Sequence, residues 1–374
     1  MSASAPTTDH ADVVVVGGGL AGLLVAGWLA EAGVDVVLCE RDHAFGGAWG
    51  LGLVELGVTE YPSRTIASLG ERAATLLAWT ARSKEHLSEL GLWERTGMLW
   101  VPVLPDEHVE VARSVQSLGR HGIAAEVREV AELARAQLTA RHAALGLPGD
   151  GRLRTSALAQ LTAWAADVGA TLCTGVRVDE VQDDDGLRVI TPGGGIRAEA
   201  VVLTAGVGGS ALHPVLRGFS PVREQGLRIE GGAHLPPAGR AGQGWTAWRS
   251  DEDGVRICGA RWATPHLEVG EREPVVTDVV QSKLEAFARG PLGLVGPVVQ
   301  RWAWVFSQSP DGLPIVGPLP GDPRLVGCIG FGAAAPGLAV AAARSVVEGL
   351  LGTDEAPVPW LLSTRRTVRW RYGR

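Results

Sequence analysis

The sequence predicts an α/β fold in which a Rossmann-like domain is interleaved with a second domain built on a mainly antiparallel sheet. Short apolar runs alternate with helix-like stretches along the 374 residues, which is typical of α/β proteins. A glycine-rich turn joins the first apolar run to the first helix-like stretch. Between residues 221 and 303 the pattern changes to strand-like pieces separated by polar loops, which indicates the second sheet.

The first unit is a strand, a glycine turn, a helix and a second strand. It comprises strand 12–16, turn 17–22, helix 23–32 and strand 34–39. The turn has the spacing GxGxxG, with Leu20 and Ala21 between the last two glycines. Gly17 permits the tight turn, Gly19 lets the backbone approach a pyrophosphate, and Gly22 lets the helix pack close to the strand. This unit predicts a dinucleotide bound at the helix N-terminus.

Two further features favour FAD as that dinucleotide. Glu40 ends the second strand and follows Gly22 at about the 20-residue spacing expected of the acid that holds the ribose hydroxyls. The paired glycines Gly46 and Gly47 come soon after this acid, as in two-domain flavoproteins. The other glycine-rich stretches, 290–296 and 330–337, lack the strand, turn, helix and acid context, so the sequence predicts no second site for NAD(P)H.

The remaining elements divide the chain between the two predicted domains. We expect a helix at 71–90, a strand at 98–103, two surface helices within 107–141, a helix at 157–168, a strand at 171–181 paired with 187–191, a strand at 200–204, strands at 227–230, 255–260 and 302–306, a strand at 325–329 and a helix at 338–351. The cofactor domain then comprises 10–90, 150–215 and 310–352, the substrate domain 91–149 and 216–309, and 353–374 is a basic C-terminal tail.

The chain resembles the D-amino-acid oxidase family, which includes glycine oxidase and monomeric sarcosine oxidase. Four blocks carry the resemblance: the fingerprint with Glu40, residues 46–48, residues 200–206, and residues 310–317 followed by 330–337. The resemblance implies FAD on one domain and substrate over the flavin in the other. The cofactor-binding residues that we assign on this basis are Gly17, Gly19, Leu20, Ala21, Gly22, Glu40, Arg41, Gly46, Gly47, Ala48, Trp49, Val178, Ala205, Gly206, Asp311, Gly312, Gly330, Gly332, Ala333 and Ala334.

Three positions depart from the family pattern. Phe306 stands where glycine oxidase and D-amino-acid oxidase have an arginine that binds the substrate carboxylate, and Gly337 stands where sarcosine oxidase has a lysine. Trp304 aligns with the cysteine that carries covalent flavin in sarcosine oxidase, so the FAD is expected to be non-covalent. Loss of the carboxylate-binding side chains favours a bulky or secondary amine or amino acid over a simple amino acid.

Aromatic residues gather in the segments expected around the flavin. Of the 13 tryptophans, six lie there: Trp49, Trp245, Trp248, Trp262, Trp302 and Trp304. Arg261 follows the strand at 255–260 and is the best remaining carboxylate anchor. The residues that we assign to the reaction are Trp49, Trp262, Arg261, Trp304 and Phe306.

The resulting prediction is an FAD-dependent oxidase or dehydrogenase that acts on CH–NH groups of an amine or amino acid. The hydrogen passes to the flavin as a hydride, and O2 or another acceptor reoxidises the cofactor. Two alternatives stay open. An FAD monooxygenase using NAD(P)H typically has a Gly-Asp motif before the C-terminal helix, where this chain has Gly330-Phe-Gly332. A flavoprotein that acts in the modification or maturation of a partner protein is compatible with the basic tail and the departures from the family.

Composition excludes several other classes. The net charge of −7 argues against nucleic-acid binding, and no apolar run reaches the roughly 18 residues that span a membrane. The histidines show no metal-binding spacing. The polar N-terminal residues predict no signal peptide, and four cysteines without a CxxC pair predict free thiols in a reducing cytoplasm. A homo-oligomer is compatible with this sequence.

Overall fold

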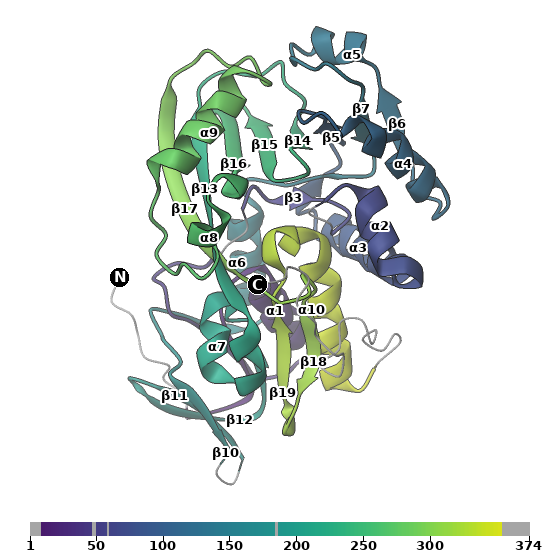
Figure 1. Cartoon of the computed structure of the whole chain (residues 1–374). Coiled ribbons are helices and arrows are strands. Elements are labelled where there is room, and N and C mark those ends of the chain that lie inside the picture. The colour runs from purple at the N-terminus through teal and green to yellow at the C-terminus, as the bar shows by residue number, and fades with distance from the viewer. Residues whose placement is uncertain (1–8, 47–49, 58–59, 184–185, 354–374) are drawn as a thin grey trace.

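The computed structural model describes residues 9–46, 50–57, 60–183 and 186–353, and it has the predicted α/β fold (Figure 1). Its described strands form three sheets, of eight, eight and three strands. The predicted site residues Gly47, Ala48 and Trp49, and the basic tail from residue 354 on, lie outside the described residues. The boundaries of the two domains stay a prediction.

The first sheet occupies the lower half of Figure 1 and contains the predicted Rossmann-like core. Its strands are β1 (His10–Val16), β2 (Val36–Glu40), β9 (Thr171–Thr174), β10 (Glu180–Asp183), β11 (Leu187–Thr191), β12 (Gly194–Leu203), β18 (Ile315–Leu319) and β19 (Asp322–Ile329). Strands β9, β2, β1, β12 and β19 pair in parallel in that order, and the pairings of β10, β11 and β18 are antiparallel.

Hydrophobic side chains on both faces explain why this sheet is central. In β1, Val13 and Val15 pack into one core and Val14 and Val16 into another, because successive side chains of a strand point to opposite faces. The first core is shared with helices α1 (Leu20–Glu31), α3 (Ala73–Glu89), α6 (Ala157–Asp167) and α10 (Ala335–Leu351). The second core is closed by α7 (Gly209–Leu212) and the short 3-10 helix η3 (Pro214–Gly218).

The second sheet forms the upper half and is mainly antiparallel, as expected. Its order is β17 (Val298–Gln308), β13 (Ser220–Ile229), β16 (Gly254–Gly259), β15 (Thr246–Asp251), β14 (Ala238–Ala241), β5 (Met98–Val101), β7 (Ala144–Leu147) and β6 (Glu126–Arg128). Helix α9 (Asp278–Arg289) covers one face of this sheet through Val280, Leu284 and Ala288. The opposite face packs on Leu51 and Leu53.

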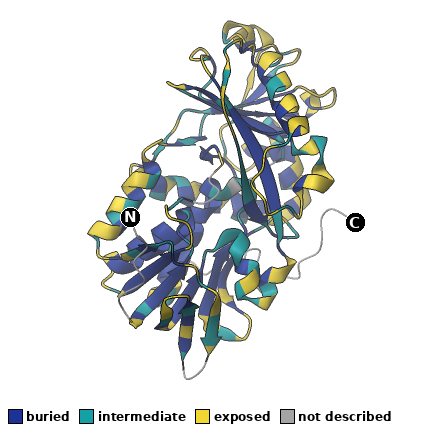
Figure 2. Cartoon of the chain, turned by 90° about the vertical axis from the view of Figure 1, so that its left-hand side faces the viewer, coloured by how far each residue is buried: buried dark blue, intermediate teal, exposed yellow. Residues whose placement is uncertain are grey.

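The remaining elements connect the two large sheets. The small third sheet contains β3 (Leu53–Val54), β8 (Gly151–Leu153) and β4 (Trp93–Glu94). The other helices are α2 (Pro62–Leu69), α4 (His108–Gly119), α5 (Val130–Arg135) and α8 (Pro265–Glu268), with 3-10 turns η1 (Gly70–Arg72), η2 (Gly206–Gly208), η4 (Arg261–Ala263) and η5 (Gly332–Ala334). Figure 2 shows that the strands of both large sheets are mostly buried, whereas the outer helices expose one side.

Two expectations about the elements were wrong. The single strand predicted at 171–181 is two strands, because Gly175 has φ +70 and breaks it; β9 pairs with β2, and only β10 pairs with β11. Helix α9 was expected to be part of a loop-and-strand region. Its apolar residues Val280, Leu284 and Ala288 recur every four residues, which is the spacing of one buried helix face. The polar residues between them made this segment resemble a loop.

Candidate active site

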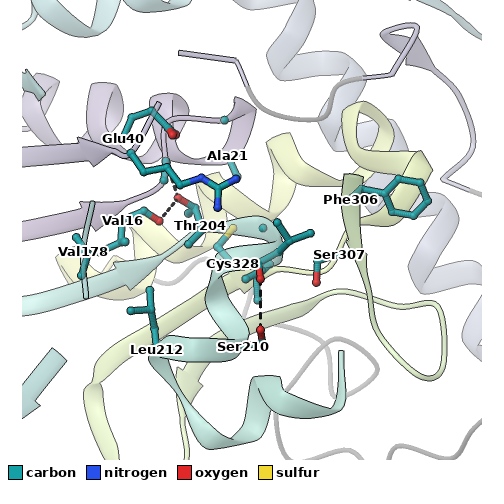
Figure 3. Close-up of a pocket in the computed structure, with 18 of the residues that line it drawn as sticks. Val16, Ala21, Glu40, Val178, Thr204, Ser210, Leu212, Phe306, Ser307 and Cys328 are labelled. Atoms are coloured by element: carbon teal, nitrogen blue, oxygen red, sulfur yellow. Dashed lines mark hydrogen bonds between the residues drawn. The ribbon is translucent and has the colours of Figure 1, made fainter. Parts of the chain in front are cut away.

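The carboxyl ends of β1, β2, β12 and β19 meet at a cavity of about 730 Å³, which we call the first cavity (Figure 3). Open parallel sheets bind their ligands at this edge. Glu40 and Phe306 lie at opposite ends of the view. The predicted cofactor or reaction residues that line this cavity are Gly17, Gly19, Leu20, Ala21, Glu40, Arg41, Gly46, Val178, Ala205, Gly206, Phe306, Gly330 and Gly332.

The three fingerprint glycines are required for different reasons. Gly17 has φ +110, and a Cβ there would lie 2.8 Å from the backbone of Thr204 and Ala205. A Cβ on Gly22 would lie 1.9 Å from the carbonyl oxygen of Gly17, so helix α1 can approach the turn only without a side chain. A Cβ on Gly19 would meet only the Gly46 carbonyl oxygen, at 3.7 Å. The protein itself therefore leaves room at Gly19, and the side of the turn facing the cavity stays open.

Glu40 both shapes the turn and faces the cavity. Its carboxylate accepts hydrogen bonds from the backbone N–H of Gly18, at 2.7 Å, and of Asp42, at 2.9 Å. The first N–H groups of α1, at Leu20 and Ala21, have no partner within the helix and line the same cavity. Anion-binding N–H groups next to a fixed carboxylate are the donor and acceptor set that a dinucleotide such as FAD requires. The residues present therefore fit this cofactor.

A second cavity of about 430 Å³ borders the first, and Phe331 and Gly332 line both. Much of its wall is apolar, including Leu69, Leu76, Val222, Trp245, Pro265, Val269 and Leu313. Glu60, Glu224, Arg240, Arg261 and Glu268 provide its charged groups. Of the predicted site residues, Arg261, Gly312, Gly332 and Ala333 line it. An apolar pocket with a few charged groups is typical of a site for a small organic molecule.

Two of the charged groups are already satisfied by the protein. The Arg240 guanidinium donates from Nε to Glu55 Oε2 at 2.6 Å, from Nη2 to the other carboxylate oxygen, and from Nη1 to the Gly244 carbonyl oxygen at 2.8 Å. Glu268 accepts from Arg223 at 2.7 and 2.9 Å. These buried pairs hold the walls of the cavity, since their hydrogen-bonding capacity is largely used.

Arg261 and Glu224 form a looser pair. Arg261 Nε lies 3.9 Å from a carboxylate oxygen of Glu224, which is longer than a hydrogen bond, and this buried Nε has no hydrogen-bond partner among the described residues. The guanidinium carbon lies 5.1 Å from the centre of the Trp245 ring and 5.3 Å from that of Phe306. Burial raises the pKa of Glu224, while Arg261 and Arg240 oppose that rise. Both groups have hydrogen-bonding capacity left for a ligand.

Other predicted site residues lie away from both cavities. Trp262 is 51% exposed with the Lys283 ammonium 5.9 Å from its ring, and Trp304 packs with the core beneath the second sheet. The Asp311 carboxylate accepts from the Ser309 hydroxyl and the Leu313 N–H and so shapes the local turn. Gly22 faces the backbone of Gly17 and does not line either cavity. The structure therefore brings together the glycine turn, Glu40, Arg261 and Phe306, but not Trp262, Trp304 or Asp311.

Sequence reasoning missed Glu224 and Arg240. Glu224 lies in β13 and Arg240 in β14, but neither position falls within a strand that the sequence predicted, so their burial was not anticipated. A charge at a buried strand position is rarely tolerated without a partner or a ligand. Trp245 was included among the aromatic candidates, and it lines the second cavity, whereas Trp248 is fully buried in the core and donates to the Pro236 carbonyl.

Within the described ranges, no group of three or more His, Cys, Asp or Glu side chains is arranged to hold a metal ion. Among the helices of the same ranges, none is both long enough and apolar enough to cross a membrane. All four cysteines are buried free thiols.

Residues 12–348 match the sequence profile of the DAO family, described as FAD dependent oxidoreductase. One curated relative is a tRNA 5-methylaminomethyl-2-thiouridine biosynthesis bifunctional protein from Marinobacter nauticus, which is 28% identical over 238 residues. That match covers 60% of this chain but only 36% of the relative, so the chain corresponds to about a third of the larger protein.

Solved structures share the fold over nearly the whole chain. Glycine oxidase from Geobacillus kaustophilus superposes with a TM-score of 0.82 at 22% identity, covering 97% of this chain and 100% of that one. L-proline dehydrogenase from P. horikoshii superposes with a TM-score of 0.78 at 19% identity, covering 96% and 97%. At these identities the similarity establishes the architecture.

Proposed function

We propose, from the premise that this chain belongs to the DAO family of FAD-dependent oxidoreductases, that it oxidises a carbon–nitrogen bond of an amine or amino acid. The observation that carries the proposal is the second cavity, where the Arg261 guanidinium and the Glu224 carboxylate lie beside an apolar wall that borders the first cavity. A cation and an anion that leave hydrogen-bonding capacity unused suit a substrate that carries both a carboxylate and an amine.

The similar proteins support this substrate class. Glycine oxidase and L-proline dehydrogenase are named for amino acids, and the curated relative is named for a methylaminomethyl group, which contains a secondary amine. A nucleic acid as the substrate of this chain is disfavoured by its net charge of −7. We therefore propose a small molecule, bulky enough to contact the apolar wall of the second cavity.

Each part of the site has a proposed task. The glycine turn, the start of α1 and Glu40 would hold the non-covalent FAD, and Gly330 and Gly332 would border its flavin end. When bound, FAD supplies the two-electron oxidation of the substrate. Arg261 would bind the carboxylate, held in place by Trp245 and Phe306. The apolar wall would exclude water and fix the C–H bond next to the nitrogen. The electron acceptor, O2 or another, and a cytoplasmic location, which the four buried free thiols support, belong to the proposal.

The first test is an absorbance spectrum of the purified protein, followed by anaerobic mixing with single reductants. The panel comprises glycine, N-methylglycine, L-proline, D- and L-phenylalanine, N-methylbenzylamine and NADPH. Bleaching of the flavin bands by an amine or amino acid is expected. Bleaching by NADPH alone would instead support the monooxygenase alternative, and a yellow protein that no member of the panel reduces would contradict the proposed substrate class.

A further inference from the structure

We propose that Glu224 is a catalytic residue whose carboxylate takes a proton from the ammonium group of the bound substrate. This inference rests on the proposed function and adds a proton-transfer step to it. The supporting observations are the orientation of Glu224 in its strand, its unused hydrogen-bonding capacity and the charges around it.

The strand register directs Glu224 toward the second cavity. Across β13 and β17, Glu224 pairs with Trp304, and Val222 pairs with Phe306. Leu227 lies three residues after Glu224 in β13, and its side chain packs into the core beneath α9. Because side chains alternate along a strand, Val222 and Glu224 lie on the face away from α9. Both line the second cavity, and Glu224 is only 7% exposed.

In the described part of the chain, the Glu224 carboxylate lacks the hydrogen bonds that the nearby carboxylates of Glu55 and Glu268 accept. Glu55 is bound by Arg240 and Glu268 by Arg223, in each case through more than one hydrogen bond. Glu224 has only the 3.9 Å contact with Arg261, and none of the described residues donates a hydrogen bond to it. A buried carboxylate without donors is costly, and an ammonium group would supply the missing hydrogen bonds.

The surrounding charges make Glu224 a suitable base. Arg261 from η4 and Arg240 from β14 attract its negative charge, whereas Glu55, after β3, repels it. Glu60 and Glu268 also line the cavity. Burial outweighs the two arginines, so the pKa of Glu224 is raised above its ordinary value. A carboxylate with a raised pKa holds a proton more firmly, which is what removing one from an ammonium group requires.

The proposed step balances without another reactant. An N–H bond of the substrate ammonium breaks and an O–H bond forms on Glu224, while the electron pair stays on nitrogen. The neutral amine is the form whose lone pair can make the C=N bond of the oxidised product. The proton returns to water when the product leaves. Glu224 must be ionised before the step, so the step is lost as the pH falls through its raised pKa.

Two simple probes test the charge of Glu224 without requiring turnover. Benzylamine carries only the ammonium group, and benzoate carries only the carboxylate. Their binding to the FAD-loaded protein is followed by flavin absorbance at pH 8. In Glu224→Gln we expect benzylamine to bind at least about tenfold more weakly and benzoate several-fold more tightly, because one buried negative charge is removed. Arg261→Gln should show the reverse pattern, and Glu252→Gln, an exposed residue in the turn after β15, should change neither.

A structural role alone would weaken both probes together, and that result would overturn the proposal. So would wild-type protein that binds neither probe, or unchanged benzylamine affinity in Glu224→Gln. Flavin reduction by the amine chosen from the panel gives a second readout. As the pH is lowered, the wild-type rate of flavin reduction should fall where Glu224 becomes protonated. In Glu224→Gln the rate should instead keep rising with pH into the alkaline range, because only the fraction of substrate that is already a neutral amine can react. Glu224-dependent binding of benzylamine without reduction by any amine would contradict the proposed function alone.

Discussion

The guanidinium carbon of Arg261 lies 5.3 Å from the centre of the Phe306 ring. Phe306 stands at the strand position where the family resemblance places a carboxylate-binding arginine. In this chain a cation comes instead from η4, which follows β16, and β16 is separated from the Phe306 strand β17 by β13. The guanidinium of Arg261 packs over the ring of Phe306. The second cavity therefore has an arginine in its wall, Arg261, although the strand position where the resemblance implies an arginine holds Phe306.

Phe306→Leu should weaken anion binding by loosening Arg261. A cation–π contact contributes about 0.5–2 kcal/mol, so we expect the Kd for benzoate to rise about 2- to 30-fold. Phe287→Leu is the matched control, because Phe287 contacts Trp248 on α9's side of the sheet. Isothermal titration of both variants measures the effect. Equal benzoate affinity in the two variants would show that the ring of Phe306 does not position Arg261.

Arg261→Gln should raise the KM of any substrate that carries a carboxylate. A hydrogen bond to a charged group contributes roughly 1.5–3 kcal/mol, which corresponds to about a 10- to 150-fold increase. The KM of an amine without a carboxylate should stay within about twofold. Arg120→Gln, at an exposed position after α4, provides the control. Steady-state kinetics with phenylalanine and N-methylbenzylamine separates the two cases, and a uniform loss would argue against a carboxylate anchor.

Gly19→Val should give a folded protein that lacks FAD. The nearest atom to a Cβ at this position is 3.7 Å away, so the protein has room for it, but the side chain would occupy the face of the turn that approaches the cofactor. Gly119→Val, which meets nothing within 4 Å, should retain both fold and flavin. Gly22→Val should not fold, because its Cβ overlaps the Gly17 carbonyl oxygen at 1.9 Å. Circular dichroism and the flavin-to-protein absorbance ratio distinguish these outcomes.

Glu55→Gln should destabilise the protein by leaving Arg240 buried without its anion. Removing one partner of a buried ion pair costs about 3–5 kcal/mol. The double variant Glu55→Leu with Arg240→Met should recover much of this loss, because neither buried charge remains. Urea denaturation followed by tryptophan fluorescence measures all three proteins. A double variant no more stable than Glu55→Gln would mean that the hydrogen bond from Arg240 to Gly244 matters more than the charge pair.

Asp150 should make the folded protein more stable at acidic pH than at neutral pH, relative to a variant without this carboxyl group. It is fully buried beside Lys84, and burial raises its pKa to about 6, with Lys84 opposing the rise. A carboxyl whose folded pKa exceeds its unfolded value stabilises the fold below the unfolded pKa, and this contribution is lost as the pH rises through 6. Relative to Asp150→Asn, the wild type should lose about 2 kcal/mol between pH 4 and 7. Calorimetric Tm values at several pH values test this, with exposed Asp167→Asn as the control; a constant Tm difference would contradict the raised pKa.

The sequence predicted the parts of the fold that local pattern controls. The buried run of β1, the glycine turn and Glu40 are contiguous features, and each lies where the pattern placed it. The second cavity was harder, because Glu224 and Arg261 are distant in sequence and meet only through the antiparallel pairing of β13 with β16. The prediction for Trp262 rested on its place in a segment expected near the flavin, whereas η4 turns its ring outward to 51% exposure.

Gly337 cannot accept a side chain where it stands. In α10, a Cβ at this position would lie 2.4 Å from the Glu55 carbonyl oxygen, so even alanine requires the helix and the segment after β3 to separate. The lysine that the family resemblance implies at position 337 is therefore not expected to be accepted by a single substitution. Changes in substrate preference, whether by natural drift or by laboratory selection, are expected to accumulate instead around η4 and β13, whose Arg261 and Glu224 side chains line the second cavity.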